Sequence, residues 1–151
     1  MRISGNAIAV NCTVVDNYNT SGIGGVYISS STATTRNCLI CGNGTGSSTA
    51  AFADSPDWYS TVADPVFENC YFSVNPTGVK PQTGDVRFKP SDLQPYGLDV
   101  RSPCRNKGVL VPGDWAEGAT DLSGAKRVYG PKIDIGCFEC QDRMGLAIKV
   151  R

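Results

Sequence analysis

Short apolar segments alternate with turn residues along the chain. No stretch keeps apolar residues at helical spacing for more than two turns. Seventeen glycines and nine prolines, together with many Ser, Thr and Asn residues, favour short strands and frequent turns over long helices. The pattern therefore predicts a nearly all-β chain.

One segment of this pattern occurs twice. Residues 11–17 read Asn-Cys-Thr-Val-Val-Asp-Asn, and residues 37–43 read Asn-Cys-Leu-Ile-Cys-Gly-Asn. Asn, Cys, a branched aliphatic residue and a closing Asn hold the same places in both copies. A period of roughly 20 to 30 residues with short strands is typical of a solenoid. The repeat predicts the coils of a right-handed parallel β-helix, truncated at its N-terminal end.

Strand alternation predicts which side chains of the repeat point inward. Cys12 and Cys38 would stack inside the solenoid, about 4.8 Å apart. Cysteine is small and readily buried, so a column of thiols fills a coil well. Asn17 and Asn43 fall where the chain must turn, and Asn tolerates left-handed backbone there. Their side chains would also hydrogen-bond from one coil to the next.

A third copy of the pattern lies at residues 69–75, after a slightly longer interval than the one between the first two copies. It would add Cys70 to the thiol column, and it requires residues 47–60 to bulge out as a loop. A competing interpretation makes residues 63–67 a linker that follows the last coil. The sequence leaves both open.

Further motifs follow the repeat in a fixed order. They are Ala-Asp-Pro-Val-Phe at 63–67, Gly-Asp-Val-Arg-Phe at 84–88, Arg-Ser-Pro-Cys at 101–104, Asp-Leu-Ser-Gly-Ala-Lys-Arg at 121–127 and Ile-Asp-Ile-Gly-Cys-Phe-Glu at 133–139.

With the repeat, this series resembles bacterial pectate-lyase-like right-handed β-helix repeat proteins. It is similar to the C-terminal region of choice-of-anchor Q surface proteins. The resemblance covers nearly the whole chain, although Cys137 stands where Ala is common and residues 89–100 are longer than the usual link. It implies an exported or surface-attached bacterial β-helix, usually without a defined activity.

The resemblance divides the chain into β-helix coils at 1–78 and a C-terminal capping segment at 79–151. We expect an irregular β cap that folds back over the last coil, because an open row of backbone donors and acceptors invites edge-to-edge pairing. We expect no such cover on the first coil, as in a piece of a longer protein. That coil could then pair with a second copy of the chain.

Composition excludes several classes of function. Fourteen basic and fourteen acidic residues balance, which argues against nucleic-acid binding and charge-driven membrane association. No apolar run is long enough for a membrane span. The chain has no histidine, so a His-ligated zinc is impossible and the commonest general base is missing. No spacing singles out catalytic residues.

Seven cysteines invite two interpretations. Cys38-x-x-Cys41 and Cys137-x-x-Cys140 have the local spacing of a four-thiolate zinc site, but the two pairs lie far apart in the sequence. Structural thiols with one disulfide, joining Cys104 to Cys137 or Cys140, explain them better. The odd number leaves at least one thiol unpaired in a monomer.

A candidate ligand site lies at Asp57, Trp58 and Tyr59. Carboxylates beside an aromatic shelf are a common way to hold a sugar or a calcium ion. The alternative is an exposed polar loop whose Trp58 packs onto the solenoid wall. We expect a weak carbohydrate contact at these three residues and no cofactor, with calcium as the alternative ligand.

These observations favour a non-catalytic structural or adhesive module of a bacterial cell-surface or secreted protein, with polysaccharide as its partner. The alternative function is that of a fragment of a pectate-lyase-like polysaccharide lyase or glycosidase. A basic groove with calcium-ligating carboxylates would favour the enzyme. An outer face of Ser, Thr and Asn would favour the module.

Overall fold

The computed structural model describes residues 1–19, 23–45, 57–73, 85–113 and 118–142. Within these residues the protein is all-β and contains no helix, as the sequence predicts. The strands are β1 (Arg2–Ile3), β2 (Ile8–Val10), β3 (Thr13–Val15), β4 (Tyr18–Asn19), β5 (Val26–Ile28), β6 (Thr34–Arg36), β7 (Leu39–Cys41), β8 (Gly44–Thr45), β9 (Trp58–Ser60), β10 (Val66–Glu68) and β11 (Tyr71–Phe72).

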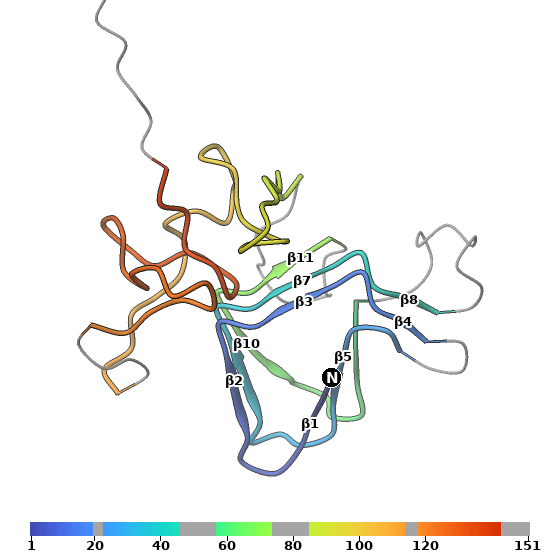
Figure 1. The fold of residues 1–151 in the computed structure, drawn as a ribbon. Coiled ribbons are helices and arrows are strands. Elements are labelled where there is room, and N and C mark those ends of the chain that lie inside the picture. The colour runs from blue at the N-terminus through green and yellow to red at the C-terminus, as the bar shows by residue number, and fades with distance from the viewer. Residues whose placement is uncertain (20–22, 46–56, 74–84, 114–117, 143–151) are drawn as a thin grey trace, which may run out of the picture.

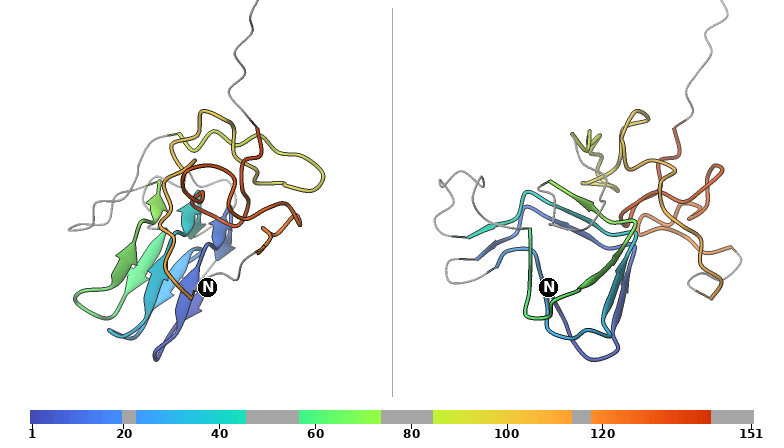
Figure 2. Two further views of the ribbon diagram at one scale, coloured as in Figure 1. Left: turned by 90° about the vertical axis from the view of Figure 1, so that its left-hand side faces the viewer. Right: turned by 180° about the vertical axis from the view of Figure 1, so that it is seen from behind.

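The strands form stacked parallel sheets. Their orders are β1-β5-β9, β2-β6-β10, β3-β7-β11 and β4-β8, and every pair is parallel. We call β1–β4 the first coil, β5–β8 the second and β9–β11 the third. Figure 1 looks along the stack, where three sheets surround a triangular interior, and the left view of Figure 2 shows the strands side by side. The arrangement fits a β-helix-like parallel fold.

The register decides between the two interpretations of residues 63–75. Val66 of β10 lies opposite Thr34 of β6, and Tyr71 of β11 lies opposite Leu39 of β7. Residues 66–72 therefore belong to a third coil, and the linker interpretation of residues 63–67 is wrong.

Inward side chains build the first of two cores. In the β3-β7-β11 sheet, Val14, Ile40 and Phe72 stack in register and belong to this core. In the third coil, aromatic rings stand where the earlier coils have smaller, mostly aliphatic side chains. Phe67 lies edge-on to Trp58 at 5.3 Å and to Phe72 at 4.9 Å between ring centroids. These aromatic contacts fill the interior of the last coil.

The corner between the second and third sheets is built from asparagine. Asn11, Asn37 and Asn69 have φ of 51°, 52° and 51°, in the left-handed region that Asn tolerates. The prediction that Asn17 and Asn43 adopt this conformation is wrong. At their turn the left-handed residues are the preceding ones, Asp16 and Gly42. A repeat shows which positions recur but not which of two adjacent turn residues takes the positive φ.

Residues 85–113 and 118–142 contribute a C-terminal segment that packs against the outer face of the β3-β7-β11 sheet. Where the structure describes them, they contain only isolated bridges, Phe88 with Leu98 and Thr120 with Lys126. A second core joins them to outward-pointing side chains of the coils, and its buried members are Val15, Leu39, Cys41, Tyr71, Val86, Leu98, Cys104, Ile135 and Cys140. This sheet is therefore buried on both faces.

This arrangement corrects the expectation that the segment covers the end of the last coil. Its contacts run along the side of the stack, from Asn11 in the first coil to Tyr71 in the third. In both views of Figure 2, from the side and from behind, the yellow-to-red segment likewise lies alongside the sheets. The reason is the uninterrupted apolar run Leu39-Ile40-Cys41, which places apolar side chains on both faces of the sheet and requires a cover on the outer one.

Candidate functional site

Asp57, the carboxylate of the expected ligand site, is buried. The residue is 2% exposed, and its Oδ1 accepts hydrogen bonds from the backbone N and the Nδ2 of Asn43 at 2.9 and 3.1 Å. Its Oδ2 accepts hydrogen bonds from the backbone N and the hydroxyl of Ser73. The carboxylate thus joins the second coil to the third, where it meets protein donors rather than a ligand.

Trp58 and Tyr59 point to opposite sides of the sheet, as neighbours in a strand do. Trp58 is half-buried and packs against the first core. Tyr59 is 49% exposed. Of the three expected ligand residues, the structure therefore presents only Tyr59 to a ligand outside the coils.

Tyr59 belongs to a group that we call the outer tyrosine column, which consists of Arg2, Tyr27 and Tyr59. Tyr27 lies opposite Arg2 on one side and opposite Tyr59 on the other. The two rings stack with centroids 5.7 Å apart and 20° between their planes. The Arg2 guanidinium lies 5.2 Å from the Tyr27 ring centroid, a cation–π contact. The column lines the outer face of the β1-β5-β9 sheet.

Sequence reasoning missed Arg2 and Tyr27, although a signal was present. Tyr27 and Tyr59 are separated along the chain by the same interval as Asn37 and Asn69. The expectation that residues 47–60 form a loop hid this signal, and it is wrong for residues 58–60, which form β9 and pair with β5. The local cluster around Trp58 drew attention instead.

Asn17 and Asn43 lie in successive coils and hydrogen-bond to each other. Asn17 donates from its backbone N and its Nδ2 to Oδ1 of Asn43, at 3.1 and 3.0 Å. Asn43 donates from Nδ2 to the carbonyl of Val14 at 2.7 Å. With Asp57 beyond Asn43, these side chains form a polar ladder that holds three coils in register.

Cys12, Cys38 and Cys70 lie in successive coils in the first core. The Cys12 backbone N–H donates to the Cys38 sulfur at 3.4 Å, and the Cys38 thiol donates to the carbonyl of Arg36 at 3.2 Å. The hydrogen bond with Cys38, together with burial, raises the pKa of Cys12. A thiol that remains protonated is a poor nucleophile and a poor metal ligand, so Cys12 serves to fill the core, where the buried Cys38 and Cys70 pack as well.

The remaining thiols form neither the four-thiolate zinc site, which the sequence disfavours, nor the expected disulfide. Cys38 belongs to the first core and Cys41 to the second, on opposite faces of β7. All seven cysteines are free, so the expected disulfide from Cys104 to Cys137 or Cys140 is not formed. Burial raises the pKa of Cys41 and of Cys104 to about 12. Within the described ranges, no group of three Cys, Asp or Glu residues is arranged to hold a metal ion.

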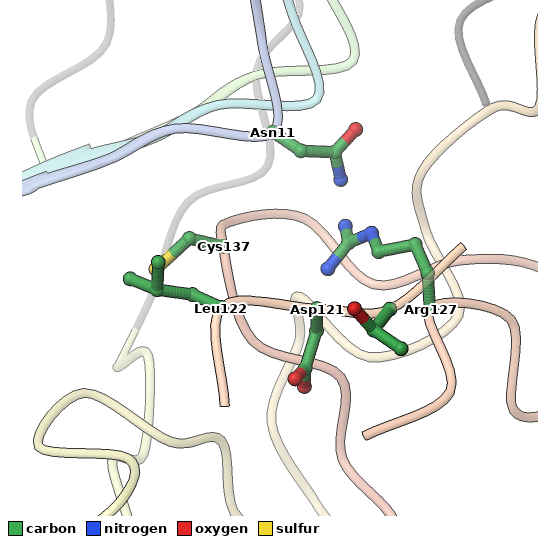
Figure 3. A pocket seen from close by; sticks show the side chains of 6 residues that line it. Asn11, Asp121, Leu122, Arg127 and Cys137 are labelled. Carbon is green, nitrogen blue, oxygen red and sulfur yellow. The ribbon is translucent and has the colours of Figure 1, made fainter. Parts of the chain in front are cut away.

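A pocket of about 270 Å³ lies where the first coil meets the C-terminal segment, and its lining residues include Asn11, Asp121, Arg127 and Cys137. Figure 3 shows the side chains of Asn11 and Arg127 pointing toward each other, with the Asp121 carboxylate turned away. Asn11 Nδ2 donates to the carbonyls of Asp134 and Gly136 at 3.1 and 3.2 Å. Arg127 Nη2 donates to the same two carbonyls at 2.9 Å each.

Polar side chains of this pocket therefore hydrogen-bond to the backbone of residues 134–136 from two sides. Asn11 belongs to the repeat, and Arg127 belongs to the motif at residues 121–127. The pocket walls hold the C-terminal segment on the coils, which gives the ordered motifs a structural role.

The motif carboxylates organise the backbone in the same way. Asp121 Oδ1 accepts hydrogen bonds from the backbone N and hydroxyl of Ser123 and from the backbone N of Ala125, and its Oδ2 accepts one from the backbone N of Glu139. Asp134 accepts from the backbone N of Asn106 and of Cys140. These acceptors replace the strand pairing that the segment lacks.

Comparisons with known proteins give no further guidance, because no family model, no curated protein and no solved structure matches this chain. Among the described residues, none belongs to a helix able to cross a membrane.

Proposed function

We propose that this protein is a non-catalytic structural and adhesive module of a bacterial cell-surface or secreted right-handed parallel β-helix protein, and that it contacts polysaccharide through the outer tyrosine column. The stacked, outward-facing pair of Tyr27 and Tyr59 carries the adhesive part of this proposal. The right hand of the coils is supported by the general rule that crossover connections between parallel strands are right-handed in about 98% of cases.

The use of polar side chains inside the protein supports the structural part. Asn17, Asn43 and Asp57 bond one coil to the next, and Asn11 and Arg127 fasten the C-terminal segment. Side chains fixed by several protein partners are poorly placed to bind or transfer protons with a substrate. Their arrangement suits a rigid rod.

The chemistry of the column supports a sugar as its partner. Tyrosine combines a large apolar ring with a hydroxyl group, so it suits ligands that are apolar on one side and polar at the edge. A pyranose ring has this character. Tyr59 stacks on Tyr27, and Tyr27 contacts Arg2, so the two rings are oriented before a ligand binds. This lowers the conformational entropy lost on binding.

A glycan array with wild type and two variants tests the proposal. Tyr59→Ala removes the exposed ring, and Leu93→Ala, at a side chain 75% exposed in the C-terminal segment, is the matched control. We expect wild type and the control to bind the same glycans, and Tyr59→Ala to lose about tenfold in affinity, because a stacking contact is worth about 0.5–1.5 kcal/mol beyond its buried area.

Three outcomes would overturn the proposal. The first is that wild type binds no glycan, with or without calcium. The second is that Tyr59→Ala binds as wild type does, which would place the contact elsewhere. The third is cleavage of a uronate polysaccharide, which would favour the lyase or glycosidase.

A further inference from the structure

Four charged side chains are buried together where the C-terminal segment meets the coils. Asp121, Arg127, Asp134 and Glu139 are 7%, 1%, 1% and 0% exposed, and we call them the charge knot. Arg127 Nη1 lies 3.9 Å from Glu139 Oε2. Glu139 also accepts hydrogen bonds from the backbone N of Tyr129 at 3.2 Å and of Asp134 at 3.0 Å.

The knot shapes the loop that touches the coils. Its member Arg127 holds the carbonyls of Asp134 and Gly136, which Asn11 of the first coil also holds. In the same loop, the Gly136 N–H donates to the carbonyl of Asn37 in the second coil at 2.9 Å. A change in the charge knot should therefore also weaken the hydrogen bonds that attach this loop to the first and second coils.

The charges in the knot do not balance. Three carboxyl groups share one guanidinium, and the coil residues that contact this loop, Asn11, Thr13 and Asn37, are neutral. The ionisable groups that act on Glu139 are Asp134 and Arg127, while Asp121 and the Cys137 thiol act on Arg127, and Arg105 acts on Asp134. Two neighbouring carboxylates without water are costly to ionise together.

Burial sets the direction in which the knot responds to pH. Burial raises the pKa of Glu139 from its ordinary value near 4.5 to about 7, and the nearby Asp134 carboxyl contributes in the same direction. Burial also raises the pKa of Asp134. Glu139 therefore keeps its proton in the folded protein over a range in which the unfolded chain has lost it.

We propose that the charge knot makes the hold of the C-terminal segment on the coils pH-dependent, firm in mildly acidic solution and weaker in alkaline solution. The folded state binds more protons than the unfolded state between pH 4.5 and 7, so stability falls as pH rises through this range. Above pH 4.5 the unfolded chain has lost this proton, and stability keeps falling until Glu139 of the folded protein is ionised as well, near pH 7. The contact that weakens is the one between the C-terminal segment and the outer face of the β3-β7-β11 sheet.

Hydrogen exchange of the Gly136 and Cys137 amides tests this inference. Both donate across the attachment, to Asn37 and to the Thr13 hydroxyl. After correction for intrinsic exchange rates, we expect their protection in wild type to fall about tenfold between pH 6 and pH 8, as linkage requires for these two pKa values. Glu139→Gln cannot ionise, so its protection should not change with pH.

Glu68→Gln is the matched control, because Glu68 is a partly exposed carboxylate on the outer face of the coils. It should keep the wild-type pH dependence. Equal protection of wild type at pH 6 and pH 8 would overturn the inference, as would a wild-type slope in Glu139→Gln. Should that variant not fold, the carbon-13 carboxyl resonance of Glu139 in wild type decides. A midpoint near pH 7 supports the inference, and a midpoint below pH 5 overturns it.

Discussion

The coils and the C-terminal segment satisfy their backbone hydrogen bonds in different ways. In the coils, each strand pairs with the equivalent strand of the next coil. In residues 85–142 the described backbone has only isolated bridges, and buried side chains such as Asp121 and Asp134 serve as acceptors. The same requirement, that buried polar groups be paired, is met by repetition in one region and by individual residues in the other.

This difference determines what each region tolerates. A position in a coil has equivalent positions in the adjacent coils, and the backbone hydrogen bonds there do not depend on one side chain. A carboxylate of the C-terminal segment serves several backbone groups at once. Substitutions in the coils should act through volume, and substitutions in the segment through unpaired polar groups.

The largest effect is expected from Phe72→Ala. Phe72 is fully buried in the last coil and packs edge-on against Phe67. The loss of a buried phenylalanine and the cavity that remains should lower the free energy of unfolding by about 3–5 kcal/mol. Urea denaturation measures this, with Leu93→Ala expected to change it by less than about 0.5 kcal/mol. A loss below about 1 kcal/mol would show that the coil interior is not packed as described.

Asp121→Ala sharpens the comparison. The substitution leaves four donors without their acceptor, and each buried unsatisfied group costs about 1–3 kcal/mol where water cannot replace the partner. We expect a total loss of about 3 kcal/mol after partial access of water. Amide exchange should show it first in residues 121–139, with the Leu39 amide still protected. Equal loss of protection in both regions would contradict the separation drawn here.

Two substitutions of Asn37 separate its backbone from its side chain. Asn37 donates to and accepts from the backbone of Val109, at 2.8 and 2.9 Å, from a left-handed conformation. Asn37→Gly keeps the backbone conformation and loses only the pairing, whereas Asn37→Ala also introduces strain. We expect losses of about 1–2 kcal/mol for Gly and about 1 kcal/mol more for Ala. Equal values would mean that the positive φ carries no cost.

The smallest effect is expected from Glu68→Gln. Glu68 pairs with Arg36 at 2.5 Å on the outer face of adjacent coils. Such pairs at a partly exposed surface contribute about 0.2–1 kcal/mol, and salt screens them. Thermal denaturation at low and high salt should show the difference between wild type and variant shrinking as salt rises. A salt-independent loss would assign Glu68 a role other than charge pairing.

The sequence predicted the coils well because repetition carries the information twice. The Asn-Cys pattern at residues 11 and 37 located the repeat, and strand alternation put Cys12 and Cys38 inside. The corner at Asn11 and Asn37 was not predicted, because the pattern does not show which of its Asn residues take the positive φ. Asp57 could not be placed in this way, since its carboxylate bonds to Asn43 and Ser73, which lie in other parts of the chain and share no motif with it. The sideways position of the C-terminal segment depends on both faces of β7 being apolar, a pattern that this short strand expresses only in Leu39, Ile40 and Cys41.

Scalar couplings across hydrogen bonds give the most direct test of the central claim, that three coils stack in register and the C-terminal segment is fastened to their side. The bonds to detect run from the Leu39 N–H to the Cys12 carbonyl, from the Tyr71 N–H to the Cys38 carbonyl, and from the Gly136 N–H to the Asn37 carbonyl. We predict a coupling for all three pairs in one sample. A coupling from Leu39 or Tyr71 to any other carbonyl would contradict the stacked coils, and a coupling from Gly136 to a carbonyl outside the coils would contradict the side attachment.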